Sequence, residues 1–119
     1  MKNIVMILND SPYGSERLYN SLRIAHALLD QDQQAVRLKV FLMSDSVYGA
    51  LQSQQTPELS YNIQQMLEIL LAQDVPVVLC KTCVSARGIS LSGLISDVEV
   101  GTLDTLTDWT LNADQVLTM

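Results

Sequence analysis

The chain has 119 residues, of which 48% are hydrophobic and 5% aromatic, and its formal net charge is −6. This length suits a single domain, residues 1–119, with a core built mainly from aliphatic side chains. The negative charge argues against a nucleic-acid partner, whose phosphates would repel it. Because no apolar run approaches the roughly 20 residues that span a bilayer, we expect no membrane partner either.

The cellular compartment is suggested by the N-terminus and the cysteines. The apolar run at residues 4–8 is too short for a secretory signal and is better interpreted as a first strand. The chain contains two cysteines, and a chain without an export signal keeps its thiols reduced in the cytoplasm. We therefore predict a cytoplasmic protein.

Short apolar runs recur along the chain and predict about five strands. The runs are residues 4–8, 38–43, 75–80, 98–100 and 115–118. Helical spacing between them predicts helices that begin after Ser15, after Ser60 or Asn62, and after Thr102, each a suitable N-cap. The polar stretch of residues 30–35 is expected to end the first helix. This alternation predicts a parallel sheet with helices on both faces.

Two segments are less regular. Residues 47–60 predict a short helix or turn followed by a polar loop, and residues 89–96 predict a short helix or loop. The part of the first segment from Gln52 to Ser60 has few apolar residues to anchor it. We therefore expect it to be the most mobile internal segment and a lid over the cysteines.

The stretch VPVVLCKTCVSARG, residues 75–88, carries the strongest chemical signal. Its apolar half predicts a buried strand that ends at Cys80, and Cys83 follows in a turn that is closed by Arg87 and Gly88. Ligands in open parallel sheets bind outside the carboxyl ends of the strands, which is where Cys80 falls. Lys81 and Arg87 are close enough in sequence to favour a thiolate.

Other interpretations of the two cysteines stay open. A buried cysteine often serves as a small hydrophobic side chain. A zinc site is not expected, because it needs four ligands and the chain has one histidine and no second CxxC. A thioredoxin-like redox pair is possible, although a thioredoxin-type CxxC opens a helix after the first strand of its unit. We expect no metal and no cofactor.

Polar residues also follow the first two predicted strands. Asn9 with Asp10, and residues 44–46, would face the same edge of the sheet as Cys80. Helix capping is the alternative role for them. Tyrosines in nearby loops could line a pocket or a contact between subunits. The pocket candidates are Asn9, Tyr13, Asp45 and Lys81.

Several motifs resemble a known family. They are PYGSE at residues 12–16, NSLR at 20–23, FLMSD at 41–45, YNIQQMLEIL at 61–70, LCKTC at 79–83, RGIS at 87–90 and VLT at 116–118. The chain is similar along nearly all its length to the DsrE/DsrF-like family, and most of all to its YchN-type branch. The resemblance implies a flavodoxin-like, three-layer α/β fold and a homo-oligomer, often a hexamer.

The resemblance also implies a chemistry. The related DsrE and TusD-type proteins carry sulfur as a persulfide on one cysteine, which stands seven residues before the Arg of an Arg-Gly pair. That spacing falls on Cys80 and Arg87 in this sequence. The implied function is a sulfur-relay protein, with sulfur donor and acceptor proteins as partners.

Roles for the site residues follow from this interpretation. Cys80 would accept the sulfur and Cys83 would resolve the persulfide, while Lys81 or Arg87 stabilises the anion and Asn9 or Asp45 shapes the pocket. Because Cys80 directly ends a buried strand, we expect it to be better held than Cys83. The alternative is a non-enzymatic oligomeric binding or redox-sensing module with structural cysteines.

Overall fold

The computed structural model describes residues 1–31 and 35–119. Five strands form one sheet in the order β4-β3-β2-β1-β5, and every neighbouring pair is parallel. The predicted five-stranded parallel sheet is therefore confirmed. The bounds of the strands are β1 Lys2–Leu8, β2 Val36–Leu42, β3 Val77–Cys80, β4 Glu99–Gly101 and β5 Gln115–Thr118.

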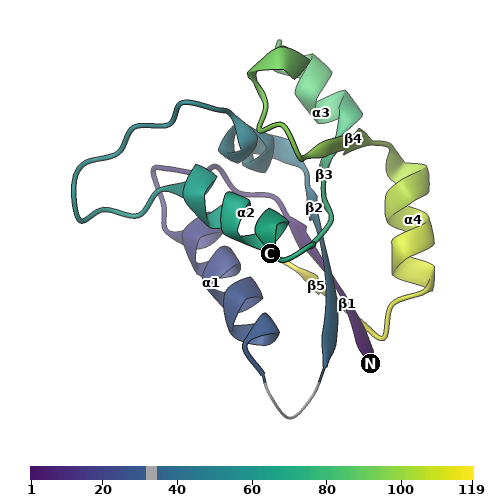
Figure 1. Cartoon of the computed structure of the whole chain (residues 1–119). Coiled ribbons are helices and arrows are strands. Elements are labelled where there is room, and N and C mark those ends of the chain that lie inside the picture. The colour runs from purple at the N-terminus through teal and green to yellow at the C-terminus, as the bar shows by residue number, and fades with distance from the viewer. Residues whose placement is uncertain (32–34) are drawn as a thin grey trace.

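Helices cover both faces of this sheet, as predicted (Figure 1). The helices α1 (Arg17–Leu29) and α2 (Ile63–Ala72) lie on one face, and α4 (Leu103–Leu111) lies on the other. A short helix, α3 (Lys81–Ala86), directly follows β3. Two 3₁₀ helices, η1 (Ser44–Ala50) and η2 (Leu91–Gly93), complete the order. Within the described ranges, no helix is long and apolar enough to cross a membrane.

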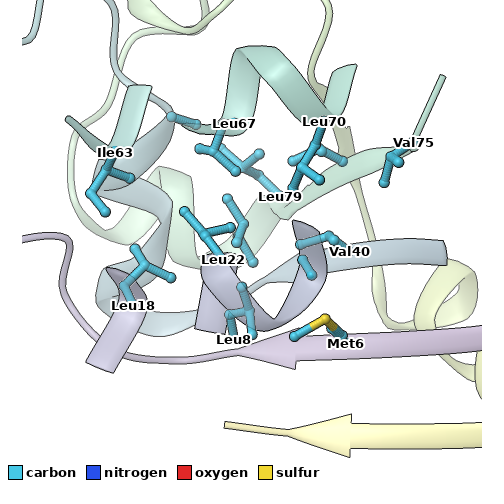
Figure 2. Close-up of a cluster of buried hydrophobic side chains, with 14 of the residues drawn as sticks. Met6, Leu8, Leu18, Leu22, Val40, Ile63, Leu67, Leu70, Val75 and Leu79 are labelled. Atoms are coloured by element: carbon cyan, nitrogen blue, oxygen red, sulfur yellow. The ribbon is translucent and has the colours of Figure 1, made fainter. Parts of the chain in front are cut away.

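The main core lies between the sheet and the pair α1 and α2 (Figure 2). Side chains of a strand alternate between the two faces, so every second residue of β1, β2 and β3 points into this layer. Each of the following side chains is fully buried: Met6, Leu8, Leu18, Leu22, Val40, Leu67, Leu70 and Leu79. The core is aliphatic, as the composition predicts.

A smaller cluster lies on the opposite face, beneath α4. Phe41, Val78 and Cys80 are buried there and pack against Leu106 and Trp109 of α4. The rings of Phe41 and Trp109 meet edge to face, with their centroids 6.0 Å apart. No residue of α4 is itself buried, so this layer is much thinner than the α1 and α2 layer.

The predicted helix starts are partly right. Asn62 is the N-cap of α2, and its side chain accepts a hydrogen bond from the backbone N–H of Gln65 at 3.1 Å. Thr102 precedes α4 without a side-chain bond. The prediction that Ser15 is the N-cap of α1 is wrong, because the N-cap is Glu16. The Ser15 hydroxyl instead accepts a hydrogen bond from the backbone N–H of Arg17. Asp30 ends α1; residues 32–34 of the predicted polar stretch lie outside the described residues.

Gln54 anchors the polar loop between η1 and α2. Its side-chain nitrogen donates to the backbone carbonyls of Gly49 and Leu51, and its backbone N–H donates to Gln64. Figure 1 shows the loop on the side of α1 and α2, away from α3. The prediction that it covers Cys80 is therefore wrong for a single chain, and its mobility stays a prediction.

Candidate functional site

The carboxyl ends of three neighbouring strands lie level with one another. Leu8 of β1 pairs with Leu42 of β2, and Leu42 pairs with Leu79 of β3. The three strands therefore end at one common edge. Asn9 is the first residue after β1, and Cys80 is the last residue of β3. The predicted meeting of these two positions at one edge is confirmed.

Cys80 ends β3 and also begins a helix. Its Sγ accepts a hydrogen bond from the backbone N–H of Cys83 at 3.4 Å, which makes Cys80 the N-cap of α3. The prediction that a turn follows Cys80 is wrong, because residues 81–86 are helical. The CxxC pair thus opens a helix, although it follows a strand late in the chain.

Gly88 explains why this helix is so short. It has a positive φ of 64°, a conformation that favours glycine. Its N–H bonds to the carbonyl of Ser85, and the N–H of Ile89 bonds to that of Val84, at 3.1 and 3.2 Å. This pair of bonds is the Schellman pattern that ends helices. Gly88 therefore ends α3 and does not simply close a turn.

Cys83 is held from outside its own helix. Its Sγ accepts the backbone N–H of Ser44 at 3.3 Å, from the segment that follows β2. Cys83 is half-buried, whereas Cys80 is only 6% exposed, and both are free thiols. Cys83 is thus not a free turn residue, because its sulfur has a partner in a second element, and the expectation that Cys80 is the better held thiol stays a prediction.

Ser44 lies at the edge where the sequence placed residues 44–46, but its contact with Cys83 was not foreseen. Its φ of 53° lies in the left-handed region, which is costly for a residue with a Cβ. Its hydroxyl also donates to Oδ1 of Asn9 at 3.4 Å, and Nδ2 of Asn9 donates to the carbonyl of Met119 at 3.3 Å. Asn9 therefore reaches the cysteines through Ser44, which fits its predicted place in the site.

Arg87 joins the site through two hydrogen bonds. Its Nε donates to Oδ1 of Asp45 at 2.9 Å, and its Nη1 donates to the carbonyl of Cys83 at 3.2 Å. The bond to Asp45 raises the pKa of Arg87 above its usual value. Arg87 and Asp45, both candidate site residues, thus form a pair that the sequence did not predict, and they link α3 to η1.

The environment of Cys80 does not favour its thiolate. Burial raises the pKa of Cys80 above the usual thiol value, and the neighbouring Cys83 side chain adds to the rise. Backbone N–H groups of α3 act in the opposite direction but are outweighed. The prediction that Lys81 or Arg87 lowers the pKa of Cys80 is wrong for the single chain with both thiols reduced. Lys81 is exposed, and Arg87 bonds to Asp45.

Tyr13 lies in a different cluster. Its hydroxyl donates to Oε1 of Gln54 and accepts the backbone N–H of Ile63 at 3.1 Å. Its ring stacks on Tyr61, which stacks in turn on Tyr19 with centroids 4.2 Å apart. Tyr13 therefore positions the loop and the start of α2, and the contacts described for it reach neither thiol.

Comparisons with known proteins agree on one family. The sequence model of the DsrE/DsrF-like family matches residues 2–119. Protein YchN of Escherichia coli K12 is 58% identical over 118 residues, which cover 99% of both chains. An uncharacterized protein of Methanopyrus kandleri, MK0008, is 32% identical over 96% of this chain and 91% of its own.

Solved structures extend this likeness to the fold. The crystal structure of the E. coli ychN protein superposes with a TM-score of 0.93 at 57% identity, over all of both chains. A protein of unknown function from Methanobacterium thermoautotrophicum, MTH1491, has a TM-score of 0.77 over all of both chains at 15% identity. At that identity, the second match shows a shared fold only.

Proposed function

This chain belongs to the DsrE/DsrF-like family, and on that premise we propose that it is a cytoplasmic sulfur carrier that holds sulfur as a persulfide on Cys80. The observation that carries the proposal is the pair of free thiols at the carboxyl edge of the sheet, with Cys80 as N-cap of α3 and Cys83 bonded to Ser44. One thiol can carry the sulfur by thiol exchange, and a second thiol beside it can resolve the persulfide. No cofactor is needed.

The first step loads the carrier. The Cys80 thiolate attacks the outer sulfur of a donor persulfide, so that a bond forms between Cys80 Sγ and that sulfur. The S–S bond of the donor breaks, and the donor cysteine leaves as a thiolate. Because Cys80 begins as a protonated thiol, its proton has to be released as the attack begins.

We assign the relay of this proton to Cys83, whose backbone N–H bonds to Cys80 Sγ. It is half-buried, so it also contacts solvent, and its sulfur is stabilised by the N–H of Ser44. In the proposed step, the proton passes through Cys83 and ends on the departing donor thiolate. The raised pKa of Cys80 then keeps the carrier unreactive until a donor is present.

Two routes unload the carrier. In the first, an acceptor thiolate attacks the outer sulfur, takes it as a new persulfide and leaves Cys80 as a thiolate. In the second, the Cys83 thiolate attacks Cys80 Sγ, which forms a Cys80–Cys83 disulfide and releases hydrosulfide. The second route requires a reductant before the next cycle, and a reduced thiol of the cytoplasm can supply the electrons.

The proposal includes assembly into a homo-oligomer, a hexamer by resemblance to the family. Large apolar side chains are exposed on both helical layers of the single chain: Ile24, Ile69, Leu103 and Leu111. Closed symmetric assemblies bury such surfaces. Light scattering should give six times the chain mass, and a monomer mass at micromolar concentration would exclude the assembly.

A second candidate function rests on the burial of Cys80. A nearly inaccessible thiol with a raised pKa is also what a structural cysteine looks like. In that case the protein is an oligomeric binding or redox-sensing module that never carries sulfur. The two candidates differ in whether a persulfide donor leaves a covalent mark on the protein.

The deciding experiment is intact-mass measurement after incubation with a persulfide donor. The wild type and the two variants Cys80→Ser and Cys83→Ser are treated alike and weighed. We expect Cys83→Ser to keep an adduct of one sulfur atom and Cys80→Ser to show none. Cys83→Ser should accumulate more adduct than the wild type, because its persulfide cannot be resolved within the chain.

Other outcomes have clear meanings. An adduct that persists in Cys80→Ser and is absent from Cys83→Ser would move the carrier role to Cys83. If neither the wild type nor Cys83→Ser gained mass, the binding or redox-sensing module would be the better account. Far-UV circular dichroism on each variant checks that the fold is retained.

A further inference from the structure

A hollow lies on the α4 face, at the end of the strands opposite the cysteines. It is a cleft of about 280 Å³ between the first halves of β1 and β2 and the C-terminal end of α4. The residues that matter for its chemistry are Asn3, Val5, Arg37, Lys39, Trp109 and Asn112. None of them belongs to the proposed sulfur site.

Two cations line this cleft side by side. Arg37 and Lys39 are two positions apart on β2, so their side chains point to the same face of the sheet. Over residues 1–31 and 35–119, the recorded ion pair is that of Arg87 with Asp45, and it involves neither of them. Adjacent like charges on one sheet face repel each other. This is notable in a chain with 13 acidic and 7 basic residues.

Two acidic residues in and just after α4 accept hydrogen bonds from residues that line the cleft. Oδ2 of Asp114 accepts the backbone N–H of Asn3 at 2.7 Å. Oδ1 of Asp108 accepts a hydrogen bond from Nδ2 of Asn112 at 3.3 Å. These bonds hold the walls of the cleft together, and neither carboxylate pairs with Arg37 or Lys39.

Trp109 is placed to report on the cleft. The ammonium of Lys39 lies over its ring, 5.3 Å from the centroid, in a cation–π contact. Trp109 is also the one tryptophan of the sequence. A ligand that draws Lys39 away from the ring therefore changes the intrinsic fluorescence of the protein.

We propose that this cleft binds the oxyanion group of a small molecule, a phosphate or a carboxylate, between Arg37 and Lys39. The guanidinium donates a fork of N–H bonds that matches such a group, and the ammonium adds a point charge. Asn3 and Asn112 add neutral amides to the lining. The cleft volume is at the lower end of ligand pockets, which indicates a small ligand.

The test is a fluorescence titration of the full chain. Inorganic phosphate and acetate are the two probes, each compared with sodium chloride at equal ionic strength. We expect a saturable change with phosphate in the millimolar range and a weaker response to acetate, since two cations face a dianion. The reverse order would identify a carboxylate as the preferred group.

Two substitutions that each remove one positive charge make the test specific. Arg37→Gln should raise the half-saturating concentration by about tenfold or more, because it removes charge-assisted hydrogen bonds. Arg17→Gln is the matched control, since it removes an exposed cation from α1 on the opposite face, and it should titrate like the wild type. A response that is not saturable, or that is equal in both variants, would overturn the proposal.

Discussion

The backbone N–H of Ser44 donates a hydrogen bond to Sγ of Cys83, over 3.3 Å. The two residues are 39 positions apart, and they belong to elements that leave neighbouring strands at the same edge of the sheet. Ser44 makes this contact with its backbone at a positive φ of 53°. The bond joins the start of η1 to α3 and gives the second thiol a partner outside its own helix.

We predict that the left-handed conformation of Ser44 is essential to the site. Ser44→Gly should keep the fold and the sulfur adduct, since glycine adopts this conformation without strain. Ser44→Val should lower the free energy of unfolding by about 2 kcal/mol, because a β-branched residue is strained there. Urea unfolding of both variants measures the difference, and equal stabilities would refute the prediction.

The ion pair of Arg87 with Asp45 should tune Cys83. Nη1 of Arg87 bonds to the backbone carbonyl of Cys83, so its positive charge lies beside that residue, and Asp45 offsets the charge. In a Cys80→Ser background, Asp45→Asn should therefore speed the alkylation of Cys83 by iodoacetamide roughly threefold. Asp30→Asn, which removes an exposed charge at the end of α1, should leave the rate unchanged. A rate that falls in Asp45→Asn would contradict this account.

The raised pKa of Cys80 predicts a loss of stability at alkaline pH. The folded state binds the thiol proton more tightly than the unfolded state does. Its stabilising effect is therefore complete below the unfolded pKa, near 8.5, and is lost as pH rises through the folded pKa. Under reducing conditions, the wild type should lose more stability between pH 8 and pH 10 than Cys80→Ala does. If the urea midpoints of the two proteins fell by the same amount over this pH range, Cys80 would not contribute to the pH dependence of stability.

Gln54 should account for most of the order in the loop before α2. Its amide bonds to Gly49 and Leu51, its backbone N–H bonds to Gln64, and its carbonyl accepts from Asn62. Gln54→Ala removes the side-chain bonds and should cost about 2 kcal/mol. It should also speed amide exchange in residues 52–60.

The neighbouring glutamine provides the control for this prediction. Gln55 is exposed, and Gln55→Ala should change neither the stability nor the exchange. If loop amides exchange as fast in the wild type as in Gln54→Ala, then Gln54 does not restrain the loop.

The sequence predicted those features that depend on neighbouring residues. Apolar runs marked all five strands, and helical spacing marked α1, α2 and α4. The position of Cys80 at the carboxyl end of β3 followed from the strand pattern and the parallel sheet. Asn62 as a helix cap followed from its side-chain chemistry.

The missed features depend on contacts between distant residues. The helix α3 is only six residues long, so it shows no apolar periodicity, although Gly88 was a sign of a helix end. The bond from Ser44 to Cys83 uses a backbone N–H, which every residue other than proline has. The raised pKa of Cys80 depends on burial beneath α4, and sequence spacing to Lys81 gave the wrong direction.

The order of the strands has a consequence for synthesis on the ribosome. β1 pairs with β2 on one side and with β5 on the other, so its second neighbour is made more than 100 residues after it. Until residues 115–118 emerge, β1 offers an open edge, and Asn9 lacks the carbonyl of Met119 that its side chain contacts. A nascent chain can therefore build its α1 and α2 layer early, while the free side of β1 is paired last. Pairing over such sequence distances is slow. The unpaired side of β1 is therefore the surface that a chaperone would have the most reason to protect during synthesis.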